Sequence, residues 1–597
     1  MLIVILSYKV WGDYLEFNNE CFDYIDWMMV HHDRDNANIS RNPENLHKYT
    51  ADKVLKEYTL KKLLDKCEAN AHINCDLHIH DLEYFPFRPL NCLQHDIRFF
   101  IRNGLKVDGD GRHTNSSRPA KHLVTLINHI GQILGSGQVN MSGGQSIPFF
   151  NTFIAPYTKG LSDREVEQAM QMFVYNLNMS YVSRGGQTVF SSVNLDLELP
   201  KFLFDVPAWY NGGIVGYYGD YEDEIKRVAH ILIKVMSDGD SVNKPFLFPN
   251  TIFHLNDKVD FDEWDDLFNL SSKYSTPYFS RELGDDYCLL MGCRTRLGIG
   301  WTGDWDKDLL RTGNIAYITL NLPKYALQSG GDLEQFYKIL YDNLQIATNI
   351  LMKRREHALN HLFKWDTNKF LTQPDVNGEP YYRIDNGTLS FGFVGLYETL
   401  KILGCPEDFS LGEDIVNVIR NYAEALKGLT PYRWTVIASP AESVAGRFAN
   451  YNRKHYGESA CVNGSDKSYY YSNSSHLPVD SSYNFIDKIR IEGRYHKYTN
   501  GGNIAHIFLG QHATGEILKN LTKKIYDYGE VGFWAYTNVY MHCNSCNNIQ
   551  KVLLDRCNVC NSEDVEYYDR ITGYLQKVSG WNDSKMAEFK DRRRFNL

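Results

Sequence analysis

Hydrophobic residues recur at three- and four-residue spacing in several long segments of the chain. The first clear case is Ala51-Asp-Lys-Val-Leu-Lys-Glu-Tyr-Thr-Leu, which predicts helix within residues 42–74. A second amphipathic helix is predicted over residues 120–134, ending on Gly135-Ser-Gly137, because glycine commonly follows the last turn of a helix. The same spacing predicts further helices over residues 164–181, 221–236, 332–357 and 413–427.

Short segments rich in β-branched and aromatic residues separate these helices. They predict strands over residues 188–197, 316–320, 388–393, 434–438 and 504–509. Strands that alternate with long helices are typical of an α/β architecture in which most strands are parallel. The periodicity itself indicates the fold class and no finer topology.

Composition and charge narrow the class of protein. The chain has 597 residues, of which 43% are hydrophobic and 14% aromatic, so it can bury a large core. Its net charge of −10, without a basic tract, argues against direct binding to nucleic acid. No apolar run approaches the ~18 residues of a membrane span, and the twelve scattered cysteines favour a reducing compartment. We therefore expect a soluble, cytoplasmic protein without a membrane partner.

Four cysteines near the C-terminus have metal-ligand spacing. Two Cys-x-x-Cys pairs, separated by ten residues, comprise Cys543, Cys546, Cys557 and Cys560. Four thiolates that converge from two tight turns form the tetrahedral site that a structural Zn²⁺ ion prefers. The spacing therefore predicts a zinc ribbon. The Lys-, Arg- and Asp-rich end that follows is consistent with a mobile, solvated terminus.

A single glycine follows these cysteines in the bulky run Arg570-Ile-Thr-Gly573-Tyr-Leu. On local sequence alone it would be an ordinary turn glycine. The tail nevertheless resembles that of the class III (anaerobic) ribonucleoside-triphosphate reductases, a glycyl radical enzyme family. The resemblance implies that Gly573 carries a stable backbone radical, installed by a separate iron-sulfur, S-adenosylmethionine-dependent activase.

Interior segments match the same family in the same order along the chain. They are His78-Ile-His80-Asp81 leading to Asn91-Cys92, then Met291-Gly-Cys293-Arg, then Gly313-Asn314. The resemblance implies that Cys293, at the tip of a finger loop, becomes a thiyl radical and that Cys92 faces it across the substrate ribose. It also implies that Asn314 hydrogen-bonds the ribose, as an amide can. Taken singly, each cysteine would be a buried core residue and Asn314 a turn residue.

The run Ser439-Pro440-Ala441-Glu442-Ser443 follows a predicted strand and precedes a helical stretch. Free backbone N–H groups at a helix start form an anion site, and in the resembling family this loop holds the substrate phosphates. The alternative is a capping box, because Ser439 and Glu442 have the Ser-x-x-Glu spacing. Met291 is a further expected substrate contact. Its thioether would lie near the sulfurs of Cys92 and Cys293 and could share radical density with them, which hints at a subclass that uses formate as its reductant. The two histidines His78 and His80 could bind a metal or join a carboxylate network at a strand end.

The resemblance implies an overall organisation as well. It implies a ten-stranded α/β barrel of two five-stranded halves, with a central finger loop, a C-terminal zinc ribbon and a glycyl radical loop. The expected divisions are an N-terminal extension over residues 1–40 without an ATP cone, a catalytic barrel over 41–535, and the ribbon and radical tail over 536–597. The resemblance also implies nucleoside triphosphate substrates, dNTP or ATP effectors and a homodimer. We expect the effector site near the helix at 119–135. The reductant stays open between formate and a redoxin.

Two other classes of function compete with a reductase. Another glycyl radical enzyme, of the formate-lyase or dehydratase type, would share the radical glycine. Such enzymes commonly lack a four-cysteine ribbon, and formate-lyases place two adjacent cysteines on the finger loop, where Cys293 stands alone. A zinc-ribbon binding protein is the non-enzyme alternative, and it would make the spacing of Cys92, Cys293 and Gly573 a coincidence.

Overall fold

The largest sheet runs through the centre of the molecule. The structure, a computed structural model, describes residues 19–31, 37–38, 41–180, 186–283, 287–292, 294–510 and 513–596. Within them seven strands pair in the order β14-β15-β8-β7-β4-β3-β2. Their bounds are β2 Leu93–Gln94, β3 Gln145–Ile147, β4 Ser191–Asp196, β7 Asn250–Leu255, β8 Pro277–Arg281, β14 Ala505–Leu509 and β15 Phe533–Asn538. All neighbouring pairs are parallel except β15 and β8.

A second sheet has the order β1-β11-β12-β13. Its strands are β1 Leu77–Ile79, β11 Asn314–Asn321, β12 Thr388–Val394 and β13 Arg433–Ala438. Strands β11, β12 and β13 are parallel, whereas β1 is antiparallel to β11. Single bridges between Gln94 and Thr312 and between Ile437 and Gly502 connect the two sheets. Both sheets are therefore parts of one continuous α/β unit.

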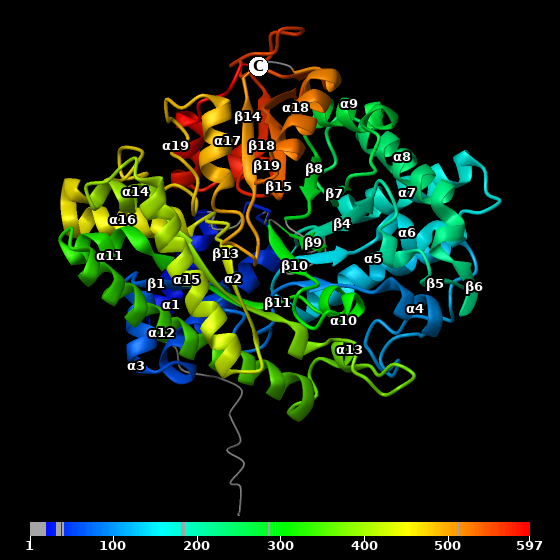
Figure 1. Ribbon diagram of the computed structural model, residues 1–597, viewed down its shortest axis with the longest axis horizontal. Coiled ribbons are helices and arrows are strands. Elements are labelled where there is room, and N and C mark those ends of the chain that lie inside the picture. The colour runs from blue at the N-terminus through cyan, green and yellow to red at the C-terminus, as the bar shows by residue number, and fades with distance from the viewer. Residues whose placement is uncertain are drawn as a thin grey trace, which may run out of the picture.

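Helices cover the two sheets on opposite flanks (Figure 1). On one flank α5, α7, α8, α9 and α18 pack in succession beside the large sheet, whereas on the other α12 packs on β11 and α15 on β13. The helices described are α1 Asn19–Val30, α2 Pro43–Tyr58, α3 Lys66–Ile73, α4 Ile97–Asn103, α5 Leu123–Asn140, α6 Phe150–Ile154, α7 Asp163–Met179, α8 Glu222–Asp238, α9 Asp265–Tyr274, α10 Trp305–Leu309, α11 Leu322–Ser329, α12 Leu333–Leu359, α13 Lys369–Thr372, α14 Leu396–Ile402, α15 Phe409–Leu429, α16 Val444–Tyr456, α17 Phe485–Gly493, α18 Gly515–Tyr528 and α19 Asp583–Asp591. Each flank has its own apolar core, because each sheet buries both faces.

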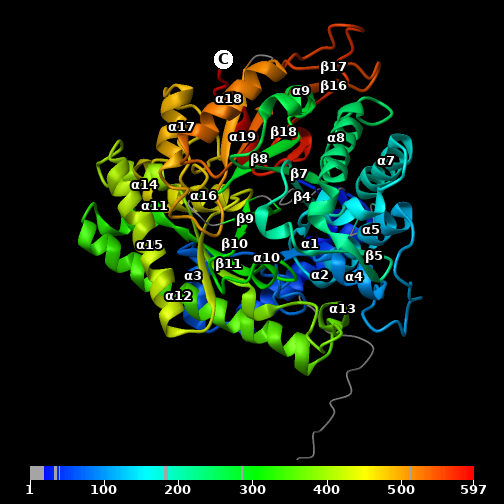
Figure 2. The same cartoon turned by 45° about the vertical axis from the view of Figure 1, so that its right-hand side comes forward.

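Two small sheets and a further hairpin complete the fold. The hairpin of β9 (Cys288–Met291) and β10 (Thr295–Gly298) lies between the large sheets, and β5 (Pro207–Tyr210) pairs with β6 (Gly213–Tyr217) at the periphery. The C-terminal sheet has the order β17-β16-β18-β19, with β16 Tyr540–Cys543, β17 Ile549–Gln550, β18 Val565–Arg570 and β19 Leu575–Lys577. Strands β16 and β17 lie at an outer edge of the molecule in Figure 2, whereas β18 lies further in.

The predicted α/β class with mostly parallel strands is confirmed, and each predicted helix and strand overlaps an observed one. One boundary was wrong. The helix predicted to end on Gly135 continues as α5 to Asn140. The reason is tertiary packing: a Cβ atom at Gly137 would lie 2.1 Å from the Gln145 side chain and 2.7 Å from that of His95. Gly137 therefore allows close contact in mid-helix and does not end it.

The expectation of a solvated C-terminus was also wrong for its last helix. The side chains of Lys585 and Glu588 on α19 are 1% and 2% exposed and form an ion pair of 2.5 Å. Arg592, directly after α19, pairs with Glu588 at 2.8 Å and with Asp569 on β18 at 3.3 Å. The charges that suggested solvent exposure instead bind the end of the chain to the body of the protein.

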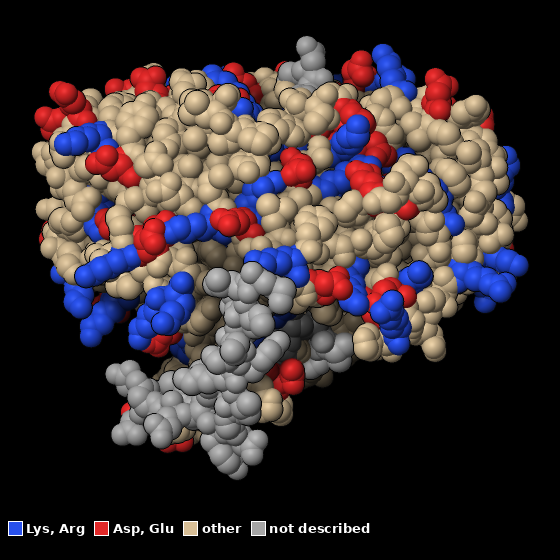
Figure 3. Space-filling view, turned by 90° about the horizontal axis from the view of Figure 1, so that it is seen from below, with Lys and Arg blue, Asp and Glu red and all other residues tan. Residues whose placement is uncertain are grey.

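Charged side chains of both signs alternate on the surface seen in Figure 3, and no broad field of Lys and Arg appears on that face. Among the described residues, no helix has the length and apolar character needed to cross a membrane.

Candidate active site

A small cavity lies where the two large sheets, the β9–β10 hairpin and the C-terminal tail meet. Its volume is about 160 Å³. The residues that matter for its chemistry are Cys92, Gly292, Arg294, Pro440, Glu442 and Tyr574. Segments that are hundreds of residues apart in the sequence thus share one enclosed space. Four of the motifs singled out in the sequence contribute to it.

Cys92 reaches the cavity from the segment that leads into β2. Its backbone N–H donates to the carbonyl oxygen of Asn314 at 3.0 Å, and its thiol donates to Asn91 Oδ1 at 2.8 Å. Two glycines allow this position. A Cβ atom at Gly143 would lie 2.6 Å from the Cys92 sulfur, and one at Gly313 would lie 1.8 Å from its carbonyl oxygen. The thiol is therefore held by backbone that only glycine can supply.

The tip of the β9–β10 hairpin also lines the cavity. Strands β9 and β10 pair up to Met291 and Thr295, and the described residues Gly292 and Arg294 lie between them. Cys293 lies outside the described residues, but its neighbours Gly292 and Arg294 both line the cavity. Gly292 has a φ of +58°, a backbone conformation that favours glycine. The Arg294 guanidinium donates to the carbonyl oxygens of Ala438 and Ser439, both at 3.3 Å.

Gly502 has the closest approach to this hairpin. It has a φ of +126°, and a Cβ atom there would lie 1.7 Å from the carbonyl oxygen of Arg294. The N–H of Arg296 donates to the carbonyl of Gly501 at 2.9 Å. The β9–β10 hairpin is thus the segment that packs against Gly501 and Gly502.

The loop over residues 439–443 divides into exposed and buried members. Pro440 and Glu442 line the cavity, Ser443 lines a neighbouring cavity, and Ser439 and Ala441 are fully buried. The alternative of a capping box is wrong, because α16 begins only at Val444 and its N-cap is Ser443. The carboxylate of Glu442 instead accepts hydrogen bonds from the Ala37 N–H at 2.9 Å and the Tyr574 hydroxyl at 3.1 Å.

Gly573 lies in the tight turn between β18 and β19, which pair up to Arg570 and Leu575. The Tyr278 hydroxyl, on β8, donates to the carbonyl oxygen of Gly573 at 2.5 Å. On the C-terminal side, Tyr574 lines the cavity and its hydroxyl bonds to Glu442. The turn is therefore buried and attached to both the large sheet and the 439–443 loop.

Asn314 and Met291 lie beside the cavity but do not line it. The Asn314 amide nitrogen donates to the Thr388 hydroxyl at 3.0 Å and to the Ser390 hydroxyl at 2.9 Å, and the side chain is fully buried. Its backbone carbonyl holds Cys92, as described above. Met291 is fully buried in the apolar core around the large sheet. The structure thus brings Cys92, the finger tip, the 439–443 loop and Gly573 together, with Asn314 and Met291 packed behind them.

Several residues at the site were not predicted as site residues, although three of them, Asp81, Arg294 and Tyr574, stand within the motifs. Asp81 lines the cavity and accepts hydrogen bonds from Asn91 at 2.7 Å and from the Ser142 hydroxyl at 2.8 Å. Arg294 and Tyr574 are adjacent to predicted residues but were not themselves predicted. Tyr278 is far from every motif. Only the positions of Arg294 and Tyr574, next to Cys293 and Gly573, could have drawn attention to them.

The four C-terminal cysteines converge as predicted. One thiol or thiolate sulfur from each of Cys543, Cys546, Cys557 and Cys560 lies within 4.8 Å of the others. The separations of 3.5 Å for Cys543–Cys560 and 3.6 Å for Cys546–Cys557 are close to the about 3.8 Å expected for sulfurs around one Zn²⁺ ion. A hydrogen bond from the Cys560 backbone N–H lowers the pKa of the Cys557 thiol to about 6, which favours a thiolate ligand. The donor set fits zinc.

Comparison with known proteins places this geometry in a family. Residues 35–595 match the sequence model described as anaerobic ribonucleoside-triphosphate reductase. The anaerobic ribonucleoside-triphosphate reductase of Salmonella typhimurium is 23% identical over 600 residues, covering 90% of this chain and 80% of that protein. The Escherichia coli protein of the same name is also 23% identical, with the same coverage.

Solved structures show the same fold. A structure of an anaerobic ribonucleotide reductase is 22% identical, covers 97% of this chain and 93% of its own, and has a TM-score of 0.78. The anaerobic ribonucleotide reductase from Thermotoga maritima, with MES in its active site, is 22% identical, covers 95% and 100%, and has a TM-score of 0.75. A glycyl radical enzyme from Archaeoglobus fulgidus has a TM-score of 0.53 at 10% identity. Because the family model matches nearly the whole chain, the resemblance stated from the motifs is confirmed: this chain belongs to the anaerobic ribonucleoside-triphosphate reductase family.

Proposed function

We propose that the protein reduces ribonucleoside triphosphates to deoxyribonucleoside triphosphates by glycyl and thiyl radical chemistry in the cavity lined by Cys92, Gly292 and Tyr574. One observation carries the proposal. The finger tip, the facing cysteine and the residue beside Gly573 share a single enclosed space of about 160 Å³. A metal-binding scaffold has no need for that convergence, whereas radical transfer between a glycine, a cysteine and a bound ribose requires it.

In the proposed reaction, a thiyl at Cys293 takes the hydrogen atom from ribose C3′. The 2′-hydroxyl then leaves as water, and Cys92 delivers a hydrogen atom from the opposite face. The Cys293 thiol returns the first hydrogen atom to C3′ and is a thiyl again, while an external donor supplies the two reducing equivalents. The Cys92–Asn91 hydrogen bond and the fixed backbone around Gly143 orient the reducing thiol. Asn314, through its backbone carbonyl, holds the same segment in place.

The loop over residues 439–443 is the proposed phosphate site. The first turn of α16 presents backbone N–H groups beside Ser443, whose side chain makes no capping bond. Met291, packed behind the finger tip, is the proposed thioether neighbour of the reacting sulfurs. Catalysis through free thiols requires a reducing compartment, which supports the cytoplasm.

We propose that zinc organises the ribbon and that a radical-forming activase installs the radical at Gly573. The four converging sulfurs support the first part, and bound Zn²⁺ would fix the two knuckles from which β18 leads to the glycine turn. Because the turn at Gly573 is buried, the tail has to move for an activase to reach it. The division proposed at residue 535 falls within β15, the last strand of the large sheet along the chain, so we propose that the tail begins after Asn538, with β16.

The two sheets support the proposal of a ten-stranded barrel. One half would comprise β2, β3, β4, β7 and β8, all parallel, and the other β11, β12, β13, β14 and β15. The antiparallel pairing of β8 with β15 would join the halves on one side, and the Gln94–Thr312 bridge would join them on the other. The finger hairpin would then pass through the middle.

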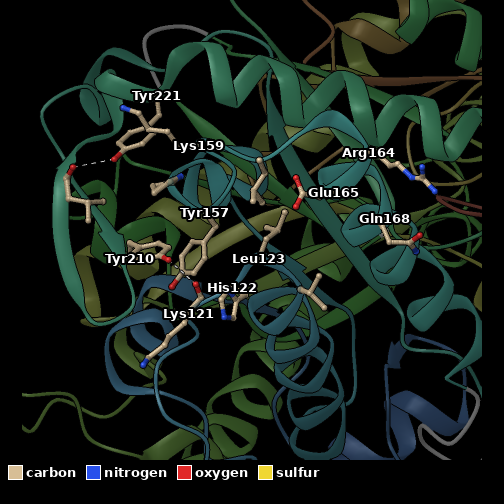
Figure 4. Close-up of a pocket in the computed structure, with 14 residues that line it drawn as sticks. Lys121, His122, Leu123, Tyr157, Lys159, Arg164, Glu165, Gln168, Tyr210 and Tyr221 are labelled. Carbon is tan, nitrogen blue, oxygen red and sulfur yellow. Dashed lines mark hydrogen bonds between the residues drawn. The ribbon is translucent and has the colours of Figure 1, made fainter.

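A larger cavity at the start of α5 is the proposed effector site (Figure 4). It has a volume of about 690 Å³, within the roughly 300–1,000 Å³ typical of small-ligand sites. Its lining includes the cations Lys121, Lys159 and Arg164 and the rings of Tyr157 and Tyr210, which suit the phosphates and base of a nucleotide. The exposed apolar side chains Val124, Ile214 and Val215 lie on the same elements and support a homodimer contact at this face.

The decisive experiment is electron paramagnetic resonance of the protein after anaerobic treatment with a radical-forming activase. We expect a glycyl doublet in the parent and none in Gly573→Ala, together with conversion of CTP to dCTP by the parent alone. Cys293→Ala should keep the doublet and release no product. Brief exposure of the activated protein to air should cut the chain once, at Gly573. A parent protein that gives the doublet but reduces no nucleotide would point to another glycyl radical enzyme.

A further inference from the structure

The finger hairpin, formed by β9 and β10, belongs to neither large sheet. Within the part of the chain that the structure describes, the only strand that pairs with β9 is β10. The outer edge of β10 is attached through the backbone, because the Arg296 N–H donates to the Gly501 carbonyl oxygen at 2.9 Å. Strand β9 is buried along its whole length, so the backbone groups on its outer edge need partners of another kind.

Side chains on one face of β4 supply these partners. Ser192 and Asn194 are two residues apart, so they point to the same face of the strand. The N–H of Gly292 donates to Ser192 Oγ at 3.3 Å, and the N–H of Leu290 donates to Asn194 Oδ1 at 3.2 Å. Strand β4 therefore holds β9 by side chains, in place of a backbone ladder.

Asn194 bonds to both sides of one finger residue. Besides accepting from the Leu290 N–H, its Nδ2 donates to the Leu290 carbonyl oxygen at 2.9 Å. The same Nδ2 donates to Ser146 Oγ on β3 at 3.1 Å, and Oδ1 lies 2.8 Å from His254 Nε2 on β7. An amide has two donors and two acceptor positions, so every one of them is used.

The Leu290 backbone fixes the orientation of this amide. Turned over, Asn194 would place its NH2 group against the Leu290 N–H and its oxygen against the Leu290 carbonyl. Because Oδ1 can only accept, His254 Nε2 carries a hydrogen atom and donates it. Burial lowers the pKa of His254 to about 3, so the ring stays neutral at pH 7. The position therefore suits an amide, whereas a carboxylate of the same size would present an oxygen to the Leu290 carbonyl.

The contacts continue to Gly292 at the tip of the finger hairpin. Its carbonyl oxygen accepts from Asn250 Nδ2 on β7 at 3.4 Å. A Cβ atom at Gly144 would lie 3.3 Å from Gly292 Cα. A Cβ atom at the preceding residue, Gly143, would lie 2.6 Å from the Cys92 sulfur. Two adjacent glycines thus make room for the finger tip and for the Cys92 thiol, and a shift of β9 along β4 would change the spacing between them.

We propose that Asn194 is a positioning residue for the radical reaction, whose amide holds β9 at the place on β4 that brings the finger tip to the cavity beside Cys92. The inference rests on the proposed function, because this placement matters for catalysis only if a radical passes between the finger tip and a bound ribose. Hydrogen-atom transfer requires near contact, and a displacement of about 1 Å can lower a rate about a hundredfold. Asn194 does not line the cavity, so it acts through the hairpin.

The first measurement needs no catalysis. Hydrogen exchange of the peptide over residues 287–298, followed by mass spectrometry, is compared between the parent and Asn194→Ala proteins. Loss of an average hydrogen bond corresponds to about a tenfold change in an opening equilibrium, so the Leu290 amide should exchange about tenfold faster in Asn194→Ala. Exchange of β4 and β7 should stay close to that of the parent.

The second measurement follows turnover of CTP after activation. Asn194→Ala and Asn194→Asp should lower kcat about a hundredfold, whereas the glycyl radical yield and the affinity for CTP should stay within about twofold of the parent. The affinity is measured by isothermal titration of the unactivated protein. A residue that only stabilised the fold would lower the radical yield, the affinity and the melting temperature together. Asn194→Asp keeps the size of the side chain, so its effect cannot come from a cavity.

Two further variants guard against a folding defect. Ser192→Ala removes one hydroxyl at the finger tip and should lower kcat about threefold in a folded protein. Asn151→Ala is the matched control, because the Asn151 amide bonds to the N–H and the carbonyl oxygen of Asp196 at 3.0 and 2.8 Å, on β4 and not on the finger hairpin. It should lower the melting temperature and leave the exchange of residues 287–298 and kcat close to those of the parent.

Unchanged exchange of residues 287–298 in a folded Asn194→Ala protein would overturn the positioning role. Equally fast exchange in Asn151→Ala would also overturn it, since the hairpin would then only follow the stability of the sheet. Full kcat in Asn194→Asp and in Ser192→Ala would do the same. A parent that reduces no nucleotide would instead contradict the proposed function, and the exchange measurement would still decide whether Asn194 holds the hairpin.

Discussion

The C-terminal tail contains two regions of opposite character. The ribbon around Cys543–Cys560 lies at the outer edge of the molecule, and Val559, Val552 and Leu553 on it are exposed. The region that follows, from β18 to α19, is buried, and Trp581 has no exposed surface. In the first region four sulfurs converge, and a few bonds such as that of Lys551 to the Ser272 carbonyl oxygen reach the body. The second region has its main contacts with residues far away in the sequence. The comparison shows that a short segment can depend on either local or distant contacts.

Hydrogen bonds to the body of the protein and within the tail hold the buried region in place. Tyr278 on β8 holds the Gly573 carbonyl, Glu442 holds the Tyr574 hydroxyl, and Arg592 donates to the carbonyls of Arg570 at 2.8 Å and Ile571 at 3.3 Å. A buried ion pair is costly to desolvate, but removing one partner is costlier still, because the other charge is left unpaired. These attachments fix the glycine turn, while the ribbon supports it from one end only.

The largest expected effect comes from removing the metal. Structural zinc contributes about 10 kcal/mol or more to the folding of small ribbons, so Cys546→Ser should unfold this region while α19 stays docked. We expect reduced zinc by atomic absorption, new trypsin cleavage near Lys551, unchanged far-UV dichroism and no glycyl radical. Cys67→Ser, at an exposed free cysteine, is the control. Full radical yield in a zinc-free protein would contradict the supporting role of the ribbon.

The next effect comes from breaking the buried ion pairs. Arg592→Met removes the partner that Glu588 and Asp569 share, while Lys585 and Arg594 stay paired with them, so the loss should be about 1.5–3 kcal/mol. Hydrogen exchange of residues 565–577 should rise while zinc content stays normal, which is the reverse of the result for Cys546→Ser. The neighbouring Arg593→Met should change neither, because Arg593 is exposed. Exchange that stays slow in Arg592→Met would show that the turn is held in another way.

Acidification should also undock the buried region, with a smaller loss of stability than the loss of the Arg592 ion pairs. Burial raises the pKa of Glu588, but Lys585 and Arg592 outweigh it, and the net pKa lies below the ordinary value of 4.5. A carboxylate with a depressed pKa contributes stability that is present above pH 4.5 and is lost as the pH falls through the folded-state pKa. Trp581 fluorescence should therefore report undocking on acidification, and Glu588→Gln should lack this pH dependence. An identical acid transition in Glu588→Gln would assign it to another group.

The smallest effect is expected for Tyr574→Phe, which removes the hydroxyl bond to Glu442 and keeps the ring. One such hydrogen bond contributes about 1 kcal/mol, or somewhat more because Glu442 is a carboxylate. We expect a normal fold and a normal zinc content. The glycyl radical, monitored by electron paramagnetic resonance at room temperature, should decay a few times faster than in the parent protein. Tyr567→Phe, whose hydroxyl bonds to Leu554 in the ribbon, is the matched control. Faster radical decay in Tyr567→Phe than in Tyr574→Phe would show that the ribbon, and not the contact with Glu442, protects the radical.

Periodicity predicted long helices such as α5, α7, α8, α12 and α15, and the strands β4, β11, β12, β13 and β14, because these elements bury one face or both. It missed β7, β8 and β15, although these central strands carry much of the large sheet. Short buried strands have no alternating pattern, so the sequence does not distinguish them from other apolar runs. It also placed the end of α5 at Gly135-Ser-Gly137, because a glycine that allows close packing, as Gly137 does, has the same local pattern as a glycine that ends a helix.

By itself, the sequence determined the chemistry that needs particular residue types at particular spacings. The four C-terminal cysteines, Cys92 and Gly573 are of this kind, because the proposed zinc site, reducing thiol and backbone radical depend on sulfur and on a residue without a side chain. Only the tertiary structure decided which groups surround them. Tyr278, Glu442 and Arg592 reach the glycine turn, and Arg447 meets His78, across separations of more than a hundred residues, except for the contact of Arg592. Such contacts depend on how strands and helices pack, and local sequence has no signal for them.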